Sequence, residues 1–217
     1  MKGVWNRRFL LALSVFPLLA AAAESAATDP AAVIAPIQSR WAVVQYTVPK
    51  DQQADQFAAL AKQAAGITAM HPGMAEPLIW EGIVLASEAG ADHGFGALSL
   101  VKQARSCLDR AVAINGNALA GSAYTTLGSL YSKVPDWPIG FGDKDKAEAY
   151  FRKALALNPA GIDDNYFYAQ YLADRGDKGA AMQRLQLALR APDRPGRALA
   201  DRGRRDQIRA LMAKLRD

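Results

Sequence analysis

Side chains that commonly carry catalysis or bind metals are few and scattered in this chain of 217 residues. Its two histidines, His71 and His93, have no other ligand residue at metal-binding spacing. The chain has no Gly-x-Ser-x-Gly motif and no phosphate loop ending in Gly-Lys-Ser/Thr. Asp143 and Asp145 fall short of a calcium loop, which needs several more oxygen ligands. We therefore expect no enzyme activity, no bound metal and no cofactor.

Two of these reactive residue types have simpler interpretations. Asp145 and Glu148 have the spacing of a capping box, so we predict that Asp145 is the N-cap of a helix. Cys107 is the single cysteine and cannot form a disulfide within the chain. We interpret it as a small, partly apolar helix residue, with an intermolecular disulfide as the alternative.

The N-terminal region has the three-part layout of a secretory signal peptide. Lys2, Arg7 and Arg8 precede an apolar run, and Ala21 and Ala23 are placed for cleavage before Glu24. The run is shorter than the roughly 20 residues of a membrane span. We predict an exported, periplasmic protein with a cleaved signal peptide (1–23), a linker (24–34) and no transmembrane span in the mature chain. An uncleaved membrane anchor is the alternative.

The excess of positive charge is local. The formal net charge is +5, but residues 190–217 alone hold nine basic and four acidic side chains. Because the basic residues lie in one terminal segment, we expect no general nucleic-acid surface. We interpret this segment as an amphipathic terminal helix, with binding to anionic lipid or an acidic partner as the alternative.

Three segments repeat one pattern of small and large apolar residues. In each, an alanine is followed four residues later by a large apolar residue, and three residues after that by another alanine. These spacings place the three side chains on one helix face. The sets are Ala104/Leu108/Ala111, Ala147/Phe151/Ala154 and Ala181/Leu185/Ala188.

The helix expected upstream of the second set carries a family signature. Tyr124, Leu127, Gly128 and Tyr131 match the first-helix pattern of the tetratricopeptide repeat (TPR), with Tyr124 where that pattern has Trp. The chain thus resembles the TPR family. The resemblance implies an all-α, TPR-like α-solenoid of three to four helix pairs with a C-terminal capping helix; a generic helical bundle is the alternative. The expected parts are a repeat domain over 35–217 with units at 38–72, 75–116, 121–159 and 162–193 and a cap over 198–216.

Two of these units are longer than the common repeat. The extra length falls at 88–97 and 134–143, and each segment contains Gly-Phe-Gly, starting twelve residues after Gly82 or Gly128. Equal offset and equal sequence predict two equivalent insertions that lie side by side on one rim of the solenoid. Whether Trp137 and Phe141 cover helix ends or form exposed anchors is left open by the sequence.

In the TPR family the first helices line a concave groove. The Lys and Asn clamp that some members use for a C-terminal carboxylate is missing, so that function is not implied. Instead the groove positions are polar and the rim is aromatic, and aromatic anchors favour protein recognition. The candidate partner- or ligand-binding residues are Thr125, Ser129, Lys133, Asp163, Tyr166 and Gln170 in the groove and Phe95, Trp137 and Phe141 on the rim.

A narrower resemblance rests on three stretches: GSAYTTLGSLYSKVPDWPIGFGD, NPAGIDDNYFY and APDRPGRALADRGRRDQI. They look like exported bacterial proteins grouped with the T-component of tripartite TRAP transporters, periplasmic helical-repeat proteins proposed to bind the solute-binding subunit. The best-known members are lipoproteins, whereas no cysteine follows the apolar run here.

These patterns favour a non-catalytic, periplasmic protein-binding scaffold associated with a transport or cell-envelope complex. Its partner would be a periplasmic solute-binding or envelope protein, with no role for nucleic acid. The alternative is a small-ligand carrier whose apolar pocket is closed by the 88–97 and 134–143 insertions.

Overall fold

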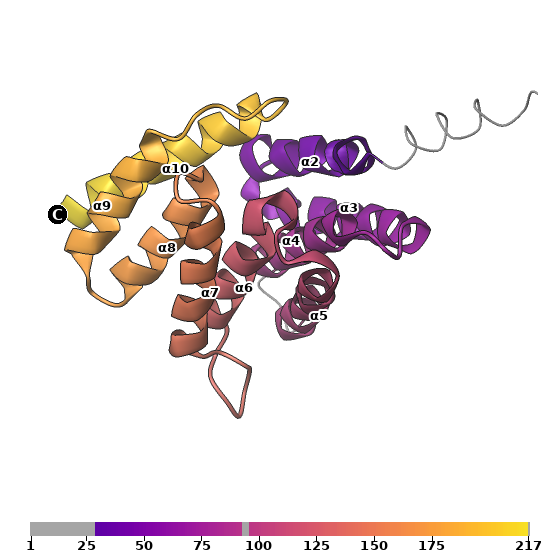
Figure 1. Cartoon of the computed structure of the whole chain (residues 1–217), viewed down its shortest axis with the longest axis horizontal. Coiled ribbons are helices and arrows are strands. Elements are labelled where there is room, and N and C mark those ends of the chain that lie inside the picture. Colours follow the sequence, from indigo (N-terminus) through magenta and orange to yellow (C-terminus); the bar gives the residue numbers. More distant parts are fainter. Residues whose placement is uncertain (1–28, 93–95, 217) are drawn as a thin grey trace, which may run out of the picture.

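A computed structural model describes residues 29–92 and 96–216, and within these ranges the chain is helical without β-strands (Figure 1). The predicted all-α class is confirmed. The predicted signal peptide and Phe95 lie outside the described residues. The elements are α2 (Pro30–Thr47), α3 (Lys50–Met70), α4 (Ala75–Ala91), α5 (Ala97–Asn115), a 3-10 turn (Ala118–Gly121), α6 (Ser122–Lys133), α7 (Lys144–Leu157), α8 (Ile162–Asp174), α9 (Lys178–Leu189) and α10 (Ala198–Arg216).

Helix α2 starts within the segment predicted to be a linker. Asp29 is its N-cap, and the carboxylate accepts a hydrogen bond from the Ala31 amide at 3.0 Å. Pro30 at the first helical position already has the φ angle of a helix. Residues 30–34 are therefore helical, and Ile34 is buried in the core, so the linker prediction is wrong for these residues.

Helix α7 begins two residues earlier than predicted. Its N-cap is Asp143, which has extended backbone angles and accepts a hydrogen bond from the Lys146 amide at 2.9 Å. This hydrogen bond lowers the pKa of Asp143. Asp145 lies inside the first turn of the helix, so its assignment as the N-cap is wrong.

The two long units obtain their extra length in different ways. Helix α4 continues to Ala91 and α5 starts at Ala97, so five of the ten residues of the first predicted insertion are helical. The second is a true ten-residue loop, because α6 ends at Lys133 and α7 starts at Lys144. The prediction of two equivalent insertions is therefore wrong: helices extend into the first from both ends, whereas the second lies wholly between helices.

The three repeated sets of small and large apolar residues form the buried face of α5, α7 and α9. All nine side chains are at most 1% exposed, which confirms that each set lies on one packed face. Glycines let the neighbouring helix approach closely. A Cβ atom on Gly82 would lie 2.7 Å from Leu108 Cγ, and one on Gly128 would lie 2.9 Å from Phe151 Cδ1.

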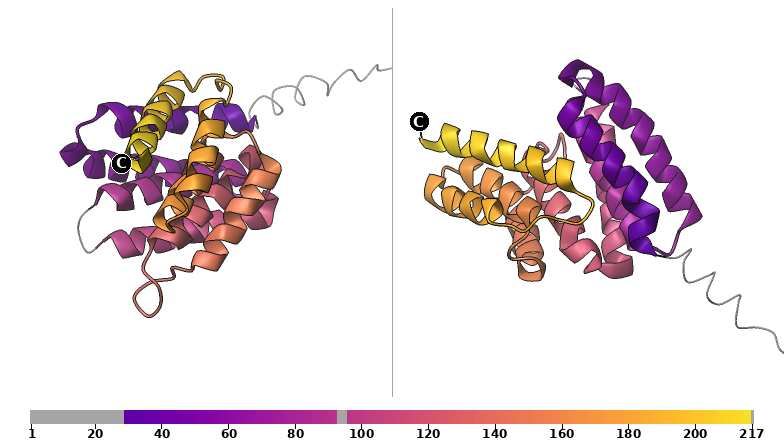
Figure 2. Two further views of the ribbon diagram at one scale, coloured as in Figure 1. Left: turned by 90° about the vertical axis from the view of Figure 1, so that its left-hand side faces the viewer. Right: turned by 90° about the horizontal axis from the view of Figure 1, so that it is seen from above.

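Each helix packs against the next along the chain, from α2 to α9. Helices α2, α4, α6 and α8 also contact one another in succession. Helix α10 spans the residues predicted for the terminal helix and packs on α8 and α9. It also contacts α2, so it bridges the two ends of the row (Figure 2).

The junction between α10 and α2 is close. A Cβ atom on Gly203 of α10 would lie 2.3 Å from Cδ1 of the Tyr46 ring on α2. Five residues further along α10, Ile208 is fully buried against α8 and α9. The apolar stripe of α10 therefore covers α8 and α9, as its sequence pattern predicts, while Gly203 brings the helix against α2.

No helix in the described ranges has both the length and the apolar character needed to cross a membrane.

Candidate functional site

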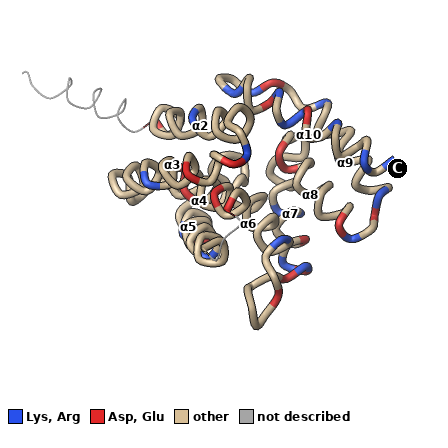
Figure 3. The backbone as a smooth tube through the Cα atoms, turned by 180° about the vertical axis from the view of Figure 1, so that it is seen from behind, with Lys and Arg blue, Asp and Glu red and all other residues tan. Residues whose placement is uncertain are grey.

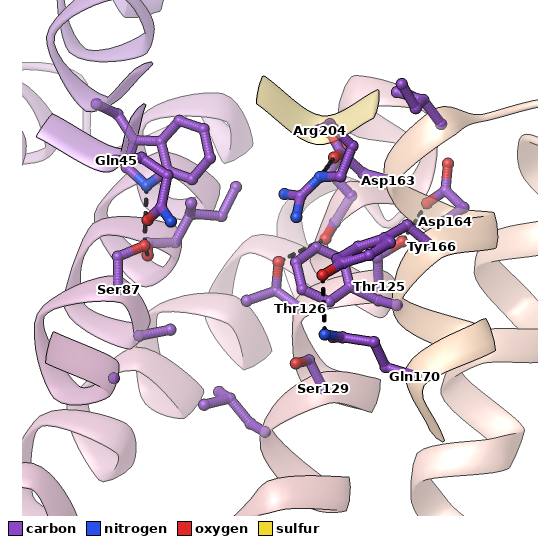
Figure 4. Close-up of a pocket in the computed structure, with 18 of the residues that line it drawn as sticks. Gln45, Ser87, Thr125, Thr126, Ser129, Asp163, Asp164, Tyr166, Gln170 and Arg204 are labelled. Atoms are coloured by element: carbon purple, nitrogen blue, oxygen red, sulfur yellow. Dashed lines mark hydrogen bonds and ion pairs between the residues drawn. The ribbon is translucent and has the colours of Figure 1, made fainter. Parts of the chain in front are cut away.

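Helices α2, α4, α6, α8 and α10 surround a cavity of about 1350 Å³ (Figure 4). We call it the central cavity. Apolar side chains supply much of its wall, and polar groups are concentrated on α6, α8 and α10. The lining residues used below are Trp41, Trp80, Ile83, Leu130 and Phe167, with Arg194, Arg197 and Arg204.

All six groove residues predicted from the sequence line the central cavity. Thr125, Ser129 and Lys133 come from α6, and Asp163, Tyr166 and Gln170 come from α8. Thr125, Ser129 and Lys133 follow one another at intervals of four, which places them on one face of α6. In Figure 4 the labelled residues of α6 and α8 stand opposite Gln45 and Ser87, which belong to α2 and α4.

Asp163 is held by two guanidinium groups. Arg204 Nε lies 2.6 Å from its Oδ1, and Arg194 Nη1 lies 2.6 Å from its Oδ2. Arg194 Nε also donates to Asp201, at 2.7 Å. Burial disfavours the charged carboxylate, but the two arginines outweigh it and hold the pKa of Asp163 well below its usual range.

The neighbouring carboxylate has a different environment. Asp164 is 5% exposed and has no arginine partner among the described residues. It accepts hydrogen bonds from Thr125 Oγ1 and, at 2.7 Å, from Asn158 Nδ2. Burial and the nearby charge of Asp163 raise the pKa of Asp164 to about 6. Consecutive acids of one helix thus have pKa values shifted in opposite directions.

We predict that this buried carboxylate makes stability depend on pH. Because the pKa of Asp164 is raised in the folded state, its contribution to stability is lost as pH rises through about 6. Between about pH 5 and 7 the free energy of unfolding should fall by about 1 kcal/mol relative to Asp164→Asn, which does not titrate. Urea denaturation of both proteins across this range measures the difference. A difference that stays constant with pH contradicts the prediction.

The aromatic groups of the cavity are fixed by neighbours. The Tyr166 hydroxyl accepts a hydrogen bond from Gln170 Nε2 at 2.9 Å, and the Arg204 guanidinium lies 4.5 Å from the Tyr166 ring centroid. On the opposite wall, Trp41 Nε1 donates to Ser87 Oγ at 2.8 Å. Such contacts limit the motion of the side chains, so the cavity has a defined shape.

The loop 134–143 places its two predicted anchors in opposite environments. The side chain of Trp137 is 85% exposed, and that of Ile139, two residues later, is 68% exposed. Phe141 instead packs edge-on to Tyr131, with ring centroids 5.3 Å apart, and the Arg105 guanidinium lies over the Phe141 ring, 4.3 Å from its centroid. Ile139 lines the cavity, whereas Trp137 and Phe141 do not. The side chain of Trp137 is therefore free for contact, and that of Phe141 ties the loop to the protein.

We predict that replacing Phe141 destabilises the protein more than replacing Trp137 does. Phe141→Ala removes a packed ring and should lower the free energy of unfolding by about 2 kcal/mol. Trp137→Ala removes an exposed ring and should change it by less than about 0.5 kcal/mol. Urea denaturation of the two variants tests this, and an equal cost for both would show that the loop is not held by Phe141.

Several residues of the cavity were not predicted from the sequence. Arg194 and Arg204 lie in the basic terminal segment, for which the sequence predicts an amphipathic terminal helix and no site residue, and Trp41 and Trp80 are not among the site residues predicted from the sequence. Arg204 is 41 positions from Asp163, and no local pattern links residues so far apart. The path of α10 across the row of helices brings them together.

In the described part of the chain, no group of three or more His, Cys, Asp or Glu side chains could hold a metal ion. Cys107 is buried, and burial raises the pKa of its thiol to about 12, which makes it a poor nucleophile. Comparison of the sequence with models of protein families gives no match, and comparison with characterised proteins gives none either.

Proposed function

We propose that this protein is a non-catalytic binding protein that holds a small organic ligand in the central cavity. The observation that carries this proposal is the contact of α10 with both α8 and α2. A groove for an extended peptide must be open along its length, whereas here a helix lies across the ends of the row. The cavity has a volume of about 1350 Å³, which is larger than the roughly 300–1,000 Å³ of common ligand pockets. It therefore has room for a small organic ligand.

We further propose that the helix pairs are TPR-like repeats of an α-solenoid. The equivalent close approaches at Gly82 and Gly128 support this, as does the buried set of small and large residues in each following helix. In this arrangement the first helices supply the cavity wall, and α10 acts as both cap and closing element.

Native mass spectrometry of the purified protein tests ligand carriage. We expect a co-purifying small molecule that is lost on denaturation. Ser129→Trp, which places a large ring at the cavity wall, should prevent its retention, while Trp137→Ala outside the cavity should not. If the protein purified from its native host shows only the mass of the polypeptide, with no bound molecule, the result counts against a ligand-carrying function.

A second candidate function is protein docking through the loop 134–143. The exposed Trp137 and Ile139 favour it, because large exposed apolar side chains often anchor protein contacts. The resemblance to TRAP T-components supports a periplasmic solute-binding or cell-envelope protein as the partner. Capture of a solute-binding protein by the wild-type protein, weakened by Trp137→Ala but not by the conservative Trp137→Phe, is the expected result. Equal capture by all three would exclude the loop as the docking surface.

A further inference from the structure

Two unpaired hydrogen-bond donors lie where α4 and the loop before α10 line the central cavity. Among the described residues, four buried side-chain polar atoms lack a hydrogen-bond partner, and these include Trp80 Nε1 and Arg197 Nε. Both residues line the cavity, and the Arg197 guanidinium lies 5.0 Å from the Trp80 ring centroid. Trp80 is only 5% exposed. Both groups can only donate hydrogen bonds, so a ligand atom that pairs with them after a small shift of either side chain must be an acceptor.

The charges around these donors are not balanced. Asp163 and Asp201 are shared between Arg194 and Arg204, so within this cluster three guanidiniums face two carboxylates. Arg197 makes no ion pair among the described residues. Burial and the neighbouring Arg194 lower the pKa of Arg197, as expected for a cation without its own counter-charge. Basic residues recur along α10 in Figure 3.

The wall beyond this cationic edge is apolar. Trp41 packs edge-on to Trp80, with ring centroids 6.0 Å apart, and Ile83 follows on the same helix as Trp80. Leu130 and Phe167 supply apolar surface from α6 and α8. A ligand whose charged end lies at Arg197 therefore has apolar surface along the rest of its length.

We propose that the central cavity binds an amphipathic anion. Its anionic head accepts hydrogen bonds from Arg197 and Trp80, and its apolar body lies along Trp41, Ile83 and Leu130. This inference rests on the proposed function, that is, on the cavity as a ligand site. Charge-assisted hydrogen bonds to a guanidinium are strong in a partly buried setting, so Arg197 supplies the preference for an anion over a neutral ligand of the same shape.

Isothermal titration with decanoate, decyl phosphate and decanol tests the inference. We expect decanoate or decyl phosphate to bind the wild-type protein at least about tenfold more tightly than decanol. The better of the two anions identifies a carboxylate or a phosphate head. Arg197→Gln should weaken anion binding by about tenfold or more while leaving decanol binding unchanged. Trp80→Phe, which removes the N–H but keeps most of the ring, should weaken anion binding by a smaller factor.

Arg152 offers a matched control, because it is an arginine outside the cavity lining whose Nη2 lies 2.6 Å from Glu148 Oε1. Arg152→Gln should change the affinity for the anions by less than about twofold, which is less than the contribution of one hydrogen bond. Near-UV circular dichroism checks that Arg197→Gln is folded, and Arg197→Lys, which keeps the charge, should recover part of the affinity. The anion inference is overturned if decanol binds the wild-type protein as tightly as the anions do. It is also overturned if Arg197→Gln binds the anions and decanol with the same affinities as the wild-type protein. In either case the cavity proposal stands. If none of the three probes binds, both fail.

Discussion

Replacing Asp163 by alanine is expected to lower the free energy of unfolding by about 3–5 kcal/mol, the cost of leaving a buried charge without its partner. Arg204 is 5% exposed, and Asp163 is its ion-pair partner, at 2.6 Å. Without that carboxylate, Arg204 keeps the hydrogen bond that it donates to Gln207, at 2.7 Å, and its contacts with the Tyr166 and Phe167 rings, but no carboxylate partner among the described residues. Its guanidinium would remain desolvated and unneutralised. Urea denaturation near neutral pH measures the loss.

Two variants separate this effect from the loss of a contact in general. Asp163→Ala combined with Arg204→Met removes both charges and should recover much of the stability, because an apolar side chain of similar length needs no counter-charge. Asp174→Ala breaks the ion pair with Lys133, whose side chains are 51% and 55% exposed. It should change stability by less than about 1 kcal/mol. If the double variant is no more stable than Asp163→Ala, the cost does not come from the unpaired arginine.

This ion pair also marks the limit of prediction from sequence. The position of Asp163 on the face of α8 that lines the central cavity follows from the register of α8, which local spacing predicts. The position of its partner Arg204 cannot be predicted in this way, because Arg204 belongs to α10, whose position depends on packing against α2. Regular features, such as the buried face of Ala147, Phe151 and Ala154, are set by periodicity within one helix. Contacts between distant helices are set by the whole fold.

The corrected boundaries have a similar cause. Asp143 and Asp145 are both good N-cap residues by type, but only Asp143 has the extended backbone that a cap requires. That geometry comes from the loop, in which the Asp143 amide donates to the Tyr131 carbonyl at 3.0 Å. Likewise, the first predicted insertion resembles the second in sequence, but α4 and α5 extend into it as a packed pair. Local sequence could not distinguish a longer helix from a loop.

Replacing Gly203 by leucine is expected to lower the free energy of unfolding by about 3 kcal/mol and to move α10 away from α2. A Cβ atom at this position would lie 2.3–2.6 Å from three atoms of the Tyr46 ring. Tyr46 cannot move aside freely, because its ring packs edge-on to Trp41 with centroids 5.8 Å apart. Helix α10 must therefore shift, although leucine favours the helix itself by about 1 kcal/mol over glycine.

Gly66→Leu is the matched control, because Gly66 also lies inside a helix but would have no atom within 4 Å of an added Cβ. It should be neutral or slightly stabilising. If α10 closes the cavity, Gly203→Leu should also expose Trp41 and Trp80, which are 8% and 5% exposed. Acrylamide quenching of tryptophan fluorescence, measured in a Trp137→Phe background, should then increase for Gly203→Leu and not for Gly66→Leu. A destabilised variant without increased quenching would mean that other elements shield these rings, and the contact between α10 and α2 would then support the fold without enclosing a ligand.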